Sequence, residues 1–270
     1  MKKFLTYLFL IIAVAVSLFP FYFMFVSSGN SNNEILSSPP ALTAGTHLIE
    51  NLQELNKKID LIRIIFNSLF ITCTYTIASL LIHSMAGFAL TKYNFRLKNV
   101  LFSIIMVTMM IPAQVLYVPL FTMMNHLGWV NSYQAVILPT LANAFGIFLM
   151  RQNMQSFPES LLEASRLDGY NEFSIFFRIV LPNMKSALGA LGIYMFLSMW
   201  NSFMWPLIIM STKSMYNFPV ALSVLDGNNW QKDYGVIMLA TSIATLPILV
   251  IFLILQNQFI SGVMGGAVKE

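Results

Sequence analysis

Long apolar runs alternate with short polar segments along this chain. Six of the runs have about the length that a helix needs to cross a bilayer, roughly twenty residues. They are about Phe4–Val26, Ile64–Leu90, Val100–Met124, Tyr133–Met150, Ala187–Met210 and Tyr234–Phe259. Because backbone polar groups in lipid must be satisfied within the chain, continuous runs of this length indicate helices rather than a barrel. The pattern predicts an all-α polytopic membrane protein with six transmembrane helices.

The polar segment from Phe157 to Pro182 has a helical period of its own. Pro158 and Glu159 suit a first helical turn, and Gly169 suits the left-handed residue that ends a helix. Charge comes from Glu163, Arg166 and Asp168, and the other side carries Leu161, Leu162, Ser165 and Leu167. A second amphipathic piece, with Phe173, Phe176, Phe177 and Val180 at helical spacing, is predicted to stop before Pro182. The segment therefore predicts helix, turn, helix and stop.

The first outer segment, from Ser27 to Asp60, predicts another amphipathic helix. Its apolar residues at helical spacing are Ile49, Leu52, Leu55 and Ile59. Such a helix is typical of a membrane interface.

Composition agrees with a membrane protein. Of the 270 residues 57% are hydrophobic and 10% are charged, with a mean hydropathy of +0.71. The single cysteine, Cys73, excludes an intrachain disulfide. Lys2 and Lys3 before the first run resemble a signal peptide, but the apolar part is too long and no Ala-x-Ala site follows, which favours an uncleaved signal anchor.

The positive charges predict the orientation. With a cytoplasmic N-terminus, the inner segments hold ten basic residues and the outer ones five. The inner set is Lys2, Lys3, Lys92, Arg96, Lys98, Arg151, Arg166, Arg178, Lys185 and Lys269, and the outer set is Lys57, Lys58, Arg63, Lys213 and Lys232. Basic residues favour the cytoplasmic side, so both termini and the segment 157–182 are expected in the cytoplasm.

The central motif resembles the EAA loop of permease subunits in binding-protein-dependent ABC importers. That pattern reads Glu-Ala-Ala, three residues, Gly, about nine residues, then hydrophobic-Leu-Pro. This chain has Glu163-Ala164-Ser165, Gly169 and Val180-Leu181-Pro182, and departs only at Ser165. The pattern without the resemblance would also fit a helical hairpin in the lipid headgroups. The resemblance implies contact with an ATPase through Glu163, Ala164, Ser165, Asp168, Gly169, Leu181 and Pro182.

Other stretches are similar to the carbohydrate-uptake type of this family. They are Ile111–Phe121, Leu127–Asn131, Trp200–Leu207 and Gly265–Lys269, and the likeness is nearest to maltose, multiple-sugar and glycerol-phosphate permeases. Most such sequences have an acidic residue after the Trp-Asn pair, where this chain has Ser202. The resemblance implies the type I importer permease fold, with residues 1–63 as signal anchor and first outer loop and residues 64–270 as the permease core.

The implied partners are a second permease subunit, two ATP-binding subunits and an extracytoplasmic solute-binding protein, in the lipid of a prokaryotic cell membrane. No nucleic acid is expected. The chain lacks a P-loop, so we expect no cofactor here, with ATP and Mg²⁺ in the partner ATPase, and no enzyme activity of its own. His47, His83 and His126 are scattered without a ligand spacing, so no metal site is expected.

Polar side chains at depth are candidates for a translocation path. Gln114, Tyr117, Asn143 and Asn201 suit a neutral polyol, which presents hydroxyls and C–H faces. Helix–helix hydrogen bonding is the alternative role. Pro112, Pro119, Pro139, Pro206 and Pro247 predict broken helices of the kind that transporters use, or ordinary kinks and membrane-edge turns.

The outer segment Ser211–Asp233 is the candidate contact for the binding protein. Aromatic residues among small polar ones, namely Tyr216, Asp226, Asn228 and Trp230, suit a docking surface, although Trp230 also fits a membrane-edge marker.

Rival functions are a permease for another small solute, a free-standing channel or ion-driven carrier, and a structural scaffold. No Asp, Glu, Lys or Arg lies deep in a predicted span after the first, so a driving proton would have no binding group. A scaffold leaves the central motif unexplained.

Overall fold

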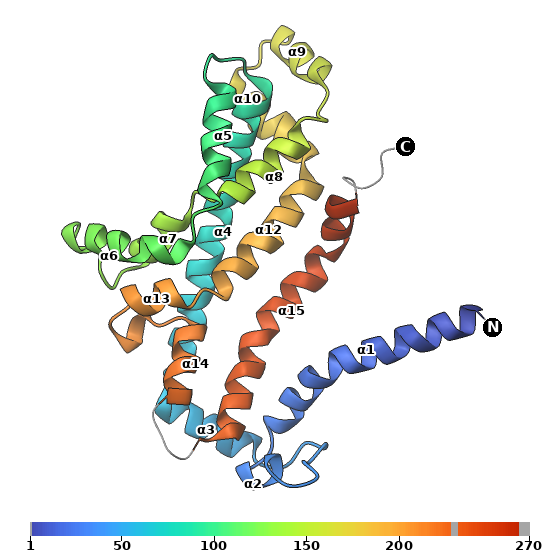
Figure 1. Cartoon of the computed structure of the whole chain (residues 1–270), viewed down its shortest axis with the longest axis vertical. Helices are drawn as coiled ribbons and strands as arrows, with labels where there is room; N and C mark the ends of the chain where they lie inside the picture. Colours follow the sequence, from blue (N-terminus) through green and yellow to red (C-terminus); the bar gives the residue numbers. More distant parts are fainter. Residues whose placement is uncertain (1, 228–231, 265–270) are drawn as a thin grey trace. The chain divides into compact units, whose positions relative to one another are not determined.

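The computed structural model describes residues 2–227 and 232–264, and every regular element in those ranges is helical (Figure 1). The chain forms two compact units. One combines the chain up to Ile65 with Phe218–Leu249, and the other contains Phe66–Asn217 and the chain from Val250 onward.

The first unit contains α1 (Lys2–Ser27), α2 (Asn32–Ile35), α3 (Leu48–Lys58), α14 (Phe218–Gly227) and the first half of α15 (Tyr234–Met264). Helix α3 confirms the amphipathic helix predicted in this segment. Its residues Asn51 and Leu55 are buried, while Ile49 and Leu52 are exposed. The Asn51 amide donates to the carbonyls of Ser28 (2.9 Å) and Asn30 (3.1 Å), which holds the turn after α1 against α3.

Helix α14 corrects the prediction of a long polar loop over Ser211–Asp233. Phe218 through Leu225 is mostly apolar, and burial of Phe218, Val220 and Ala221 favours a helix over a solvated loop.

The second unit contains most of α4 (Leu61–Lys92) and the elements that follow it. These are α5 (Lys98–Thr108), η1 (Ala113–Leu116), α6 (Tyr117–His126), α7 (Tyr133–Ile137), η2 (Leu138–Thr140), α8 (Ala144–Met154), α9 (Glu159–Leu167), α10 (Glu172–Ile175), η3 (Phe176–Val180), α11 (Leu181–Asn183), α12 (Lys185–Trp200), α13 (Met204–Ile209) and η4 (Lys213–Met215). Its core is formed by side chains such as Met150, Leu191, Met195 and Ile209, all fully buried.

The described residues contain three helices long and apolar enough to cross a membrane, at Lys3–Ser27, Leu61–Lys92 and Tyr234–Gln256. Three bent helix pairs also qualify, with bends of 94°, 49° and 83°. They are Lys98–Thr108 with Ala113–His126, Tyr133–Thr140 with Ala144–Met154, and Glu172–Asn183 with Lys185–Trp200. Counting each bent pair as one span gives six, the number that the sequence predicts, but the third pair starts at Glu172, before the predicted span that begins at Ala187.

The fifth predicted span, Ala187–Met210, is wrong at its far end, because α12 stops at Trp200. Pro206 has no N–H to give the carbonyl of Ser202, four residues earlier. That carbonyl accepts instead from the buried Asn217 amide at 2.9 Å. The polypeptide therefore turns at Asn201 and begins the short helix α13.

A second proline break follows the same logic. Pro139 leaves the carbonyl of Ala135 without its helical donor, and the indole N–H of Trp205 donates to that carbonyl at 3.0 Å. At these two prolines the freed backbone oxygens are satisfied by side chains of neighbouring elements, as a chain in lipid requires.

Candidate functional site

Helix α9 contains the EAA residues and ends as the sequence predicts. Gly169 has a φ of +81°, the left-handed conformation, and its N–H donates to the carbonyl of Arg166 at 3.1 Å. The N–H of Tyr170 donates to the carbonyl of Ser165 at 3.1 Å. These two bonds form a Schellman motif, which fixes where the helix stops and which way the chain leaves.

The two sides of α9 differ from the prediction in detail. Leu162 and Ser165 are buried, whereas Glu163, Ala164 and Asp168 are exposed. Leu161 and Leu167, predicted on the packed side, are 45% and 89% exposed. The buried stripe of α9 is narrower than the sequence pattern, because only Leu162 and Ser165 of its residues are buried. The exposed face is therefore mixed, with Leu167 and Ala164 between the carboxylates.

The sequence predicted that the second helical piece stops before Pro182. This prediction is wrong, because the helical piece continues past Pro182. It runs from α10 through the π-helical turn η3 into α11, ends at Asn183, and bends by 83° before α12. In the wider turn the N–H of Leu181 bonds to the carbonyl of Phe176, five residues earlier. Pro182 then falls in the first turn of α11, where a proline needs no N–H donor.

A buried lysine ties α9 to the end of α4. Lys92, with 3% of its side chain exposed, donates to the carbonyl of Phe157 at 2.7 Å and pairs with Glu159 at 3.0 Å. Phe157 is itself buried just before α9. The start of α9 is thus bonded to the last residue of α4 by a charge-assisted hydrogen bond, one of the stronger kinds in proteins.

A second tie joins α10 to the same end of α4. The Tyr93 hydroxyl donates to Glu172, and Arg166 of α9 donates to Glu172 through Nε at 2.8 Å. The Arg166 guanidinium and the Tyr93 hydroxyl lower the pKa of Glu172, while burial and the Glu172 carboxylate raise the pKa of Tyr93 to about 12. At neutral pH Tyr93 is therefore the donor and Glu172 the ionised acceptor.

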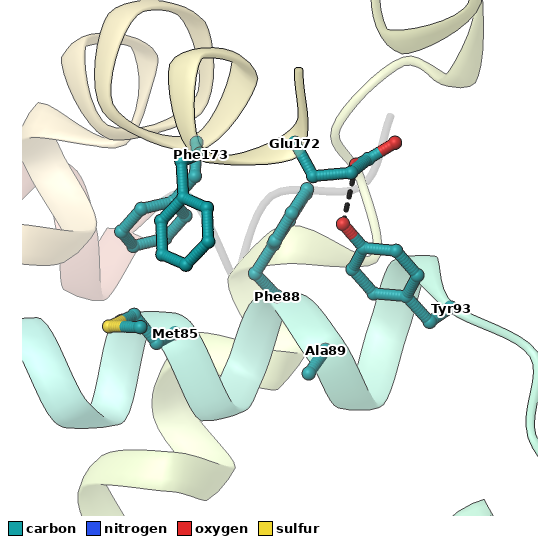
Figure 2. Close-up of a pocket in the computed structure, with 7 residues that line it drawn as sticks. Met85, Phe88, Ala89, Tyr93, Glu172 and Phe173 are labelled. Atoms are coloured by element: carbon teal, nitrogen blue, oxygen red, sulfur yellow. Dashed lines mark hydrogen bonds between the residues drawn. The ribbon is translucent and has the colours of Figure 1, made fainter.

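The joint between α4 and α10 borders an open pocket of about 190 Å³. Figure 2 shows the Tyr93 hydroxyl directed at Glu172, with Phe173 and Met85 facing each other across the space. The packed part of the joint is a contact between the rings of Phe88 and Phe176. Their centroids are 5.6 Å apart. The joint thus combines one aromatic contact and one hydrogen-bonded contact.

The structure gives the candidate path residues local partners. Asn143 caps α8 by accepting from the N–H of Gly146 at 3.2 Å, and Asn201 donates to the carbonyl of Leu197 at 2.9 Å. Tyr117 stacks on Trp205 with ring centroids 6.0 Å apart, and Gln114 is exposed on η1. The side-chain bonds of Asn143 and Asn201 are local to α8 and α12 and are not bonds between helices, and both the translocation path and its alternative stay predictions.

The candidates for binding-protein contact that the structure describes belong to different units, Tyr216 to the second and Asp226 to the first. Tyr216 is half-buried, with its carbonyl held by the Asn67 amide at 3.0 Å, and Asp226 is exposed and pairs with Lys232 at 2.6 Å. Asn228, Trp230 and the tail Gly265–Lys269 lie outside the described residues.

Sequence reasoning missed the residues that hold the candidate site in place. The sequence analysis used Lys92 only as one of the positive charges that predict the orientation. Glu172 was only part of a predicted helix, and no sequence pattern pointed to Tyr93. Their partners lie 65 to 79 residues away along the chain, so no local pattern identifies them.

The described residues are helical wherever they are regular, and with three to six apolar candidate spans they define a multi-pass membrane protein. Comparison with known proteins makes this class specific. Residues 79–264 match the family of the binding-protein-dependent transport system inner membrane component. The chain belongs to that family.

Individual relatives agree. The lactose transport system permease protein of Rhizobium radiobacter is 33% identical over 254 residues, 94% of this chain and 92% of that protein. An arabinooligosaccharides transport system permease protein of Bacillus subtilis (strain 168) is 40% identical over 207 residues, 76% of this chain and 72% of that protein. The sn-glycerol-3-phosphate transport system permease protein of Yersinia enterocolitica is 29% identical over 262 residues, which are 94% of this chain and 93% of that protein.

The fold has a solved counterpart. A chain in the crystal structure of a bacterial ABC transporter involved in the import of the acidic polysaccharide alginate superposes with a TM-score of 0.84, covering 96% of both chains at 22% identity. The fold is therefore that of an ABC importer permease.

Proposed function

We propose that this chain is one of the two membrane permeases of an ATP-driven importer for a sugar or a related polyol. The family membership and the substrates in the relatives' names, lactose, arabinooligosaccharides and glycerol phosphate, support the substrate class. A second permease, two ATP-binding subunits that hold ATP and Mg²⁺, and an extracytoplasmic binding protein complete the proposed assembly.

The observation that carries the proposal is the two-sided construction of α9. One side of α9 is held in the unit, because Leu162 and Ser165 are buried. The two ends of the helix are tied to the end of α4, through Lys92 at the start and through the Arg166–Glu172–Tyr93 cluster at the finish. The other side of α9 leaves Glu163, Ala164 and Asp168 exposed. A helix held firmly on one side and open on the other suits the transfer of a displacement from a docked ATPase to a membrane span.

Each candidate residue has a role in this proposal. Glu163 and Asp168 supply charge to the ATPase contact, Ala164 lets the partner approach closely, and Gly169 sets the direction in which the chain leaves α9. Ser165 is buried within α9, and Leu181 and Pro182 set the turn of chain that leads towards α12. The termini and α9 are assigned to the cytoplasm, and Tyr216, Asp226, Asn228 and Trp230 to the outer face, where the binding protein docks.

Uptake by the complete transporter tests the proposal. Cells that express all subunits should accumulate radiolabelled lactose, an arabino-oligosaccharide or glycerol 3-phosphate, and only with the ATP-binding subunit present. Glu163→Ala should abolish that uptake, while Glu54→Ala, at a partly exposed acid on α3, should leave it unchanged. Uptake of a probe without the ATP-binding subunit would favour the rival channel or ion-driven carrier.

Copurification supplies an independent readout. The wild-type chain should bring its ATP-binding subunit through purification in mild detergent, and Glu163→Ala should bring less of it. Equal recovery with both chains, together with normal uptake, would remove α9 as the coupling element. Uptake of none of the three probes, with the ATPase bound, would point to the alternative of another small solute.

A further inference from the structure

One face of α4 contacts the segment Leu141–Arg151, which contains the break before α8. The contacts recur at regular intervals along α4. The contacting residues of α4 are Ser79, His83, Gly87 and Thr91, spaced four apart and therefore aligned on one side of the helix. Their partners are Leu141, Asn143, Gly146, Met150 and Arg151. Figure 1 shows α8 beside α4 at this level. We call this row of contacts the α4–α8 seam.

His83 makes the central contact of the seam. Its side chain is fully buried, and its Nε2 accepts from the backbone N–H of Asn143 at 2.9 Å. Asn143 is the residue at which the chain leaves the turn after η2 and enters α8. A histidine on one helix therefore fixes the backbone of another helix at its break.

Two glycines let α4 and α8 approach closely, Gly146 against the His83 ring and Gly87 against the backbone of α8. A β-carbon on Gly146 would lie 2.5 Å from Nδ1 of His83, and one on Gly87 would lie 2.8 Å from the backbone nitrogen of Arg151. Small residues at such positions let helices in a membrane approach closely. At one end of the seam the Ser79 hydroxyl points to the carbonyl of Leu141 (3.4 Å), and at the other Thr91 points to the carbonyl of Arg151 (3.3 Å).

The seam ends near the contacts between α4 and the segment 157–182, which we call the coupling segment. Thr91 is followed by Lys92 and Tyr93, which bind Phe157 and Glu172, and α8 itself ends at Met154, three residues before Phe157. A displacement of the coupling segment therefore acts on the ends of α4 and α8 together.

We infer that α4 and the segment Leu141–Arg151 move as one body, and that His83 is the positioning residue that fixes the break at Asn143 to that body. This inference rests on the proposed function. The seam carries the displacement of the coupling segment along α4 to the broken span, where the translocation path opens or closes. His83 acts through Asn143 and needs no contact with the transported solute.

Replacements at His83 test the positioning role. Glutamine places a carbonyl oxygen at about the reach of Nε2, whereas asparagine is shorter and leucine has no acceptor. Uptake of the radiolabelled probe that the wild type transports should fall roughly tenfold in His83→Leu and His83→Asn, because the Asn143 N–H loses its acceptor. His83→Gln should restore most of it.

The readout that separates positioning from folding is the ATP hydrolysed per solute imported, measured with the complete transporter in proteoliposomes. His83→Leu should keep its ATPase bound and hydrolysing, so this ratio should rise roughly tenfold, in step with the lost uptake. An unchanged ratio, or equal behaviour of the Gln and Asn variants, overturns the role of His83. A wild type without ATP-driven uptake would instead overturn the proposed function.

A cross-link tests the single body. Ser79→Cys with Leu141→Cys, in a Cys73→Ser background, should be bridged by a short bis-methanethiosulfonate, which forms a disulfide with each cysteine and releases sulfinate. The bridged transporter should import its probe at the unbridged rate. Loss of uptake on bridging, and recovery on reduction of the two disulfides, would mean that the two segments must separate, which overturns the inference. The two single-cysteine variants are the controls for the reagent.

A double-mutant cycle checks the contact between Gly146 and the His83 ring. The three atoms nearest to a β-carbon at Gly146 all belong to that ring. Gly146→Ala should therefore impair uptake strongly in the wild type and weakly in His83→Ala. Additive effects would contradict direct contact.

Discussion

At the scale of single residues, Gly169 has the clearest requirement. Its φ of +81° is costly for a residue with a β-carbon, by roughly 1–2 kcal/mol, and more for a β-branched one. No atom lies within 4 Å of the β-carbon position, so the cost is in the backbone alone. Gly169→Val should therefore misdirect α9 and abolish ATP-driven uptake, whereas Gly169→Asn, which tolerates this conformation, should retain most of it.

Gly128 provides the matched control. It too has a positive φ, +68°, with open space around its β-carbon position, but it ends α6. Gly128→Val should therefore keep the ATPase stably attached. If both valine variants lose their ATPase to the same extent, the effect of Gly169→Val is general misfolding and not misdirection of α9.

Glu172 predicts a pH dependence. Its pKa is lowered from the ordinary value of 4.5 by Arg166 and Tyr93. A lowered folded-state pKa stabilises the protein above the unfolded value, and the contribution is lost as pH falls from about 4.5 through the folded pKa. The midpoint of thermal unfolding in detergent should fall over that window in the wild type and less in Glu172→Gln. Glu163→Gln, on the exposed face, should behave as the wild type, and parallel curves for all three would exclude the cluster as the cause.

Residues that follow a local rule could be predicted from the sequence. The left-handed Gly169 and the exposed carboxylates of Glu163 and Asp168 follow from the spacing of one short motif. Lys92, Tyr93 and His83 could not be found in this way, because each is defined by a partner at least 60 residues distant. Their chemistry depends on tertiary structure.

At the scale of elements, the tie between α4 and α9 depends on Lys92. Lys92→Met keeps the apolar stem but removes the donor to the buried carbonyl of Phe157, which should cost about 1.5–3 kcal/mol, the range for hydrogen bonds to charged groups. Uptake should fall while the span inserts normally. The measurements are the free energy of unfolding and the initial rate of import.

Glu159→Gln separates the two bonds that Lys92 makes. Glu159 is 60% exposed on its side chain, so its ion pair should contribute no more than about 1 kcal/mol. We expect Glu159→Gln to retain most of the import. An effect as large as that of Lys92→Met would assign the tie to the ion pair and not to the bond with Phe157.

The positions of the helices were predictable, but their breaks were only partly so. Hydropathy predicts the six apolar segments, and Pro139 and Pro206 indicate where a helix can bend or end. Whether a proline bends or ends a helix depends on what satisfies the freed carbonyl, here the Trp205 indole and the Asn217 amide. Both donors lie on other elements, so the end of α12 at Trp200 was not visible in the sequence.

At the scale of the whole molecule, the orientation rests on ten basic residues on one side and five on the other. The structure adds that Lys92, one of the ten, binds the segment containing α9, so the end of α4 and the EAA residues must lie on the same side of the membrane. The orientation and the coupling proposal thus depend on each other, and a test of one constrains the other.

Labelling of single cysteines in intact cells tests that orientation. In a Cys73→Ser background, Asn171→Cys replaces the exposed cap of α10 within the segment 157–182, and Glu54→Cys replaces a partly exposed residue of α3. A membrane-impermeant maleimide should label Glu54→Cys from outside and reach Asn171→Cys only after the cells are opened. Asn228→Cys, in the second outer segment, should follow Glu54→Cys. Labelling of Asn171→Cys in sealed cells would put α9 outside, where no cytoplasmic ATPase could reach Glu163, and the coupling proposal would fail together with the predicted topology.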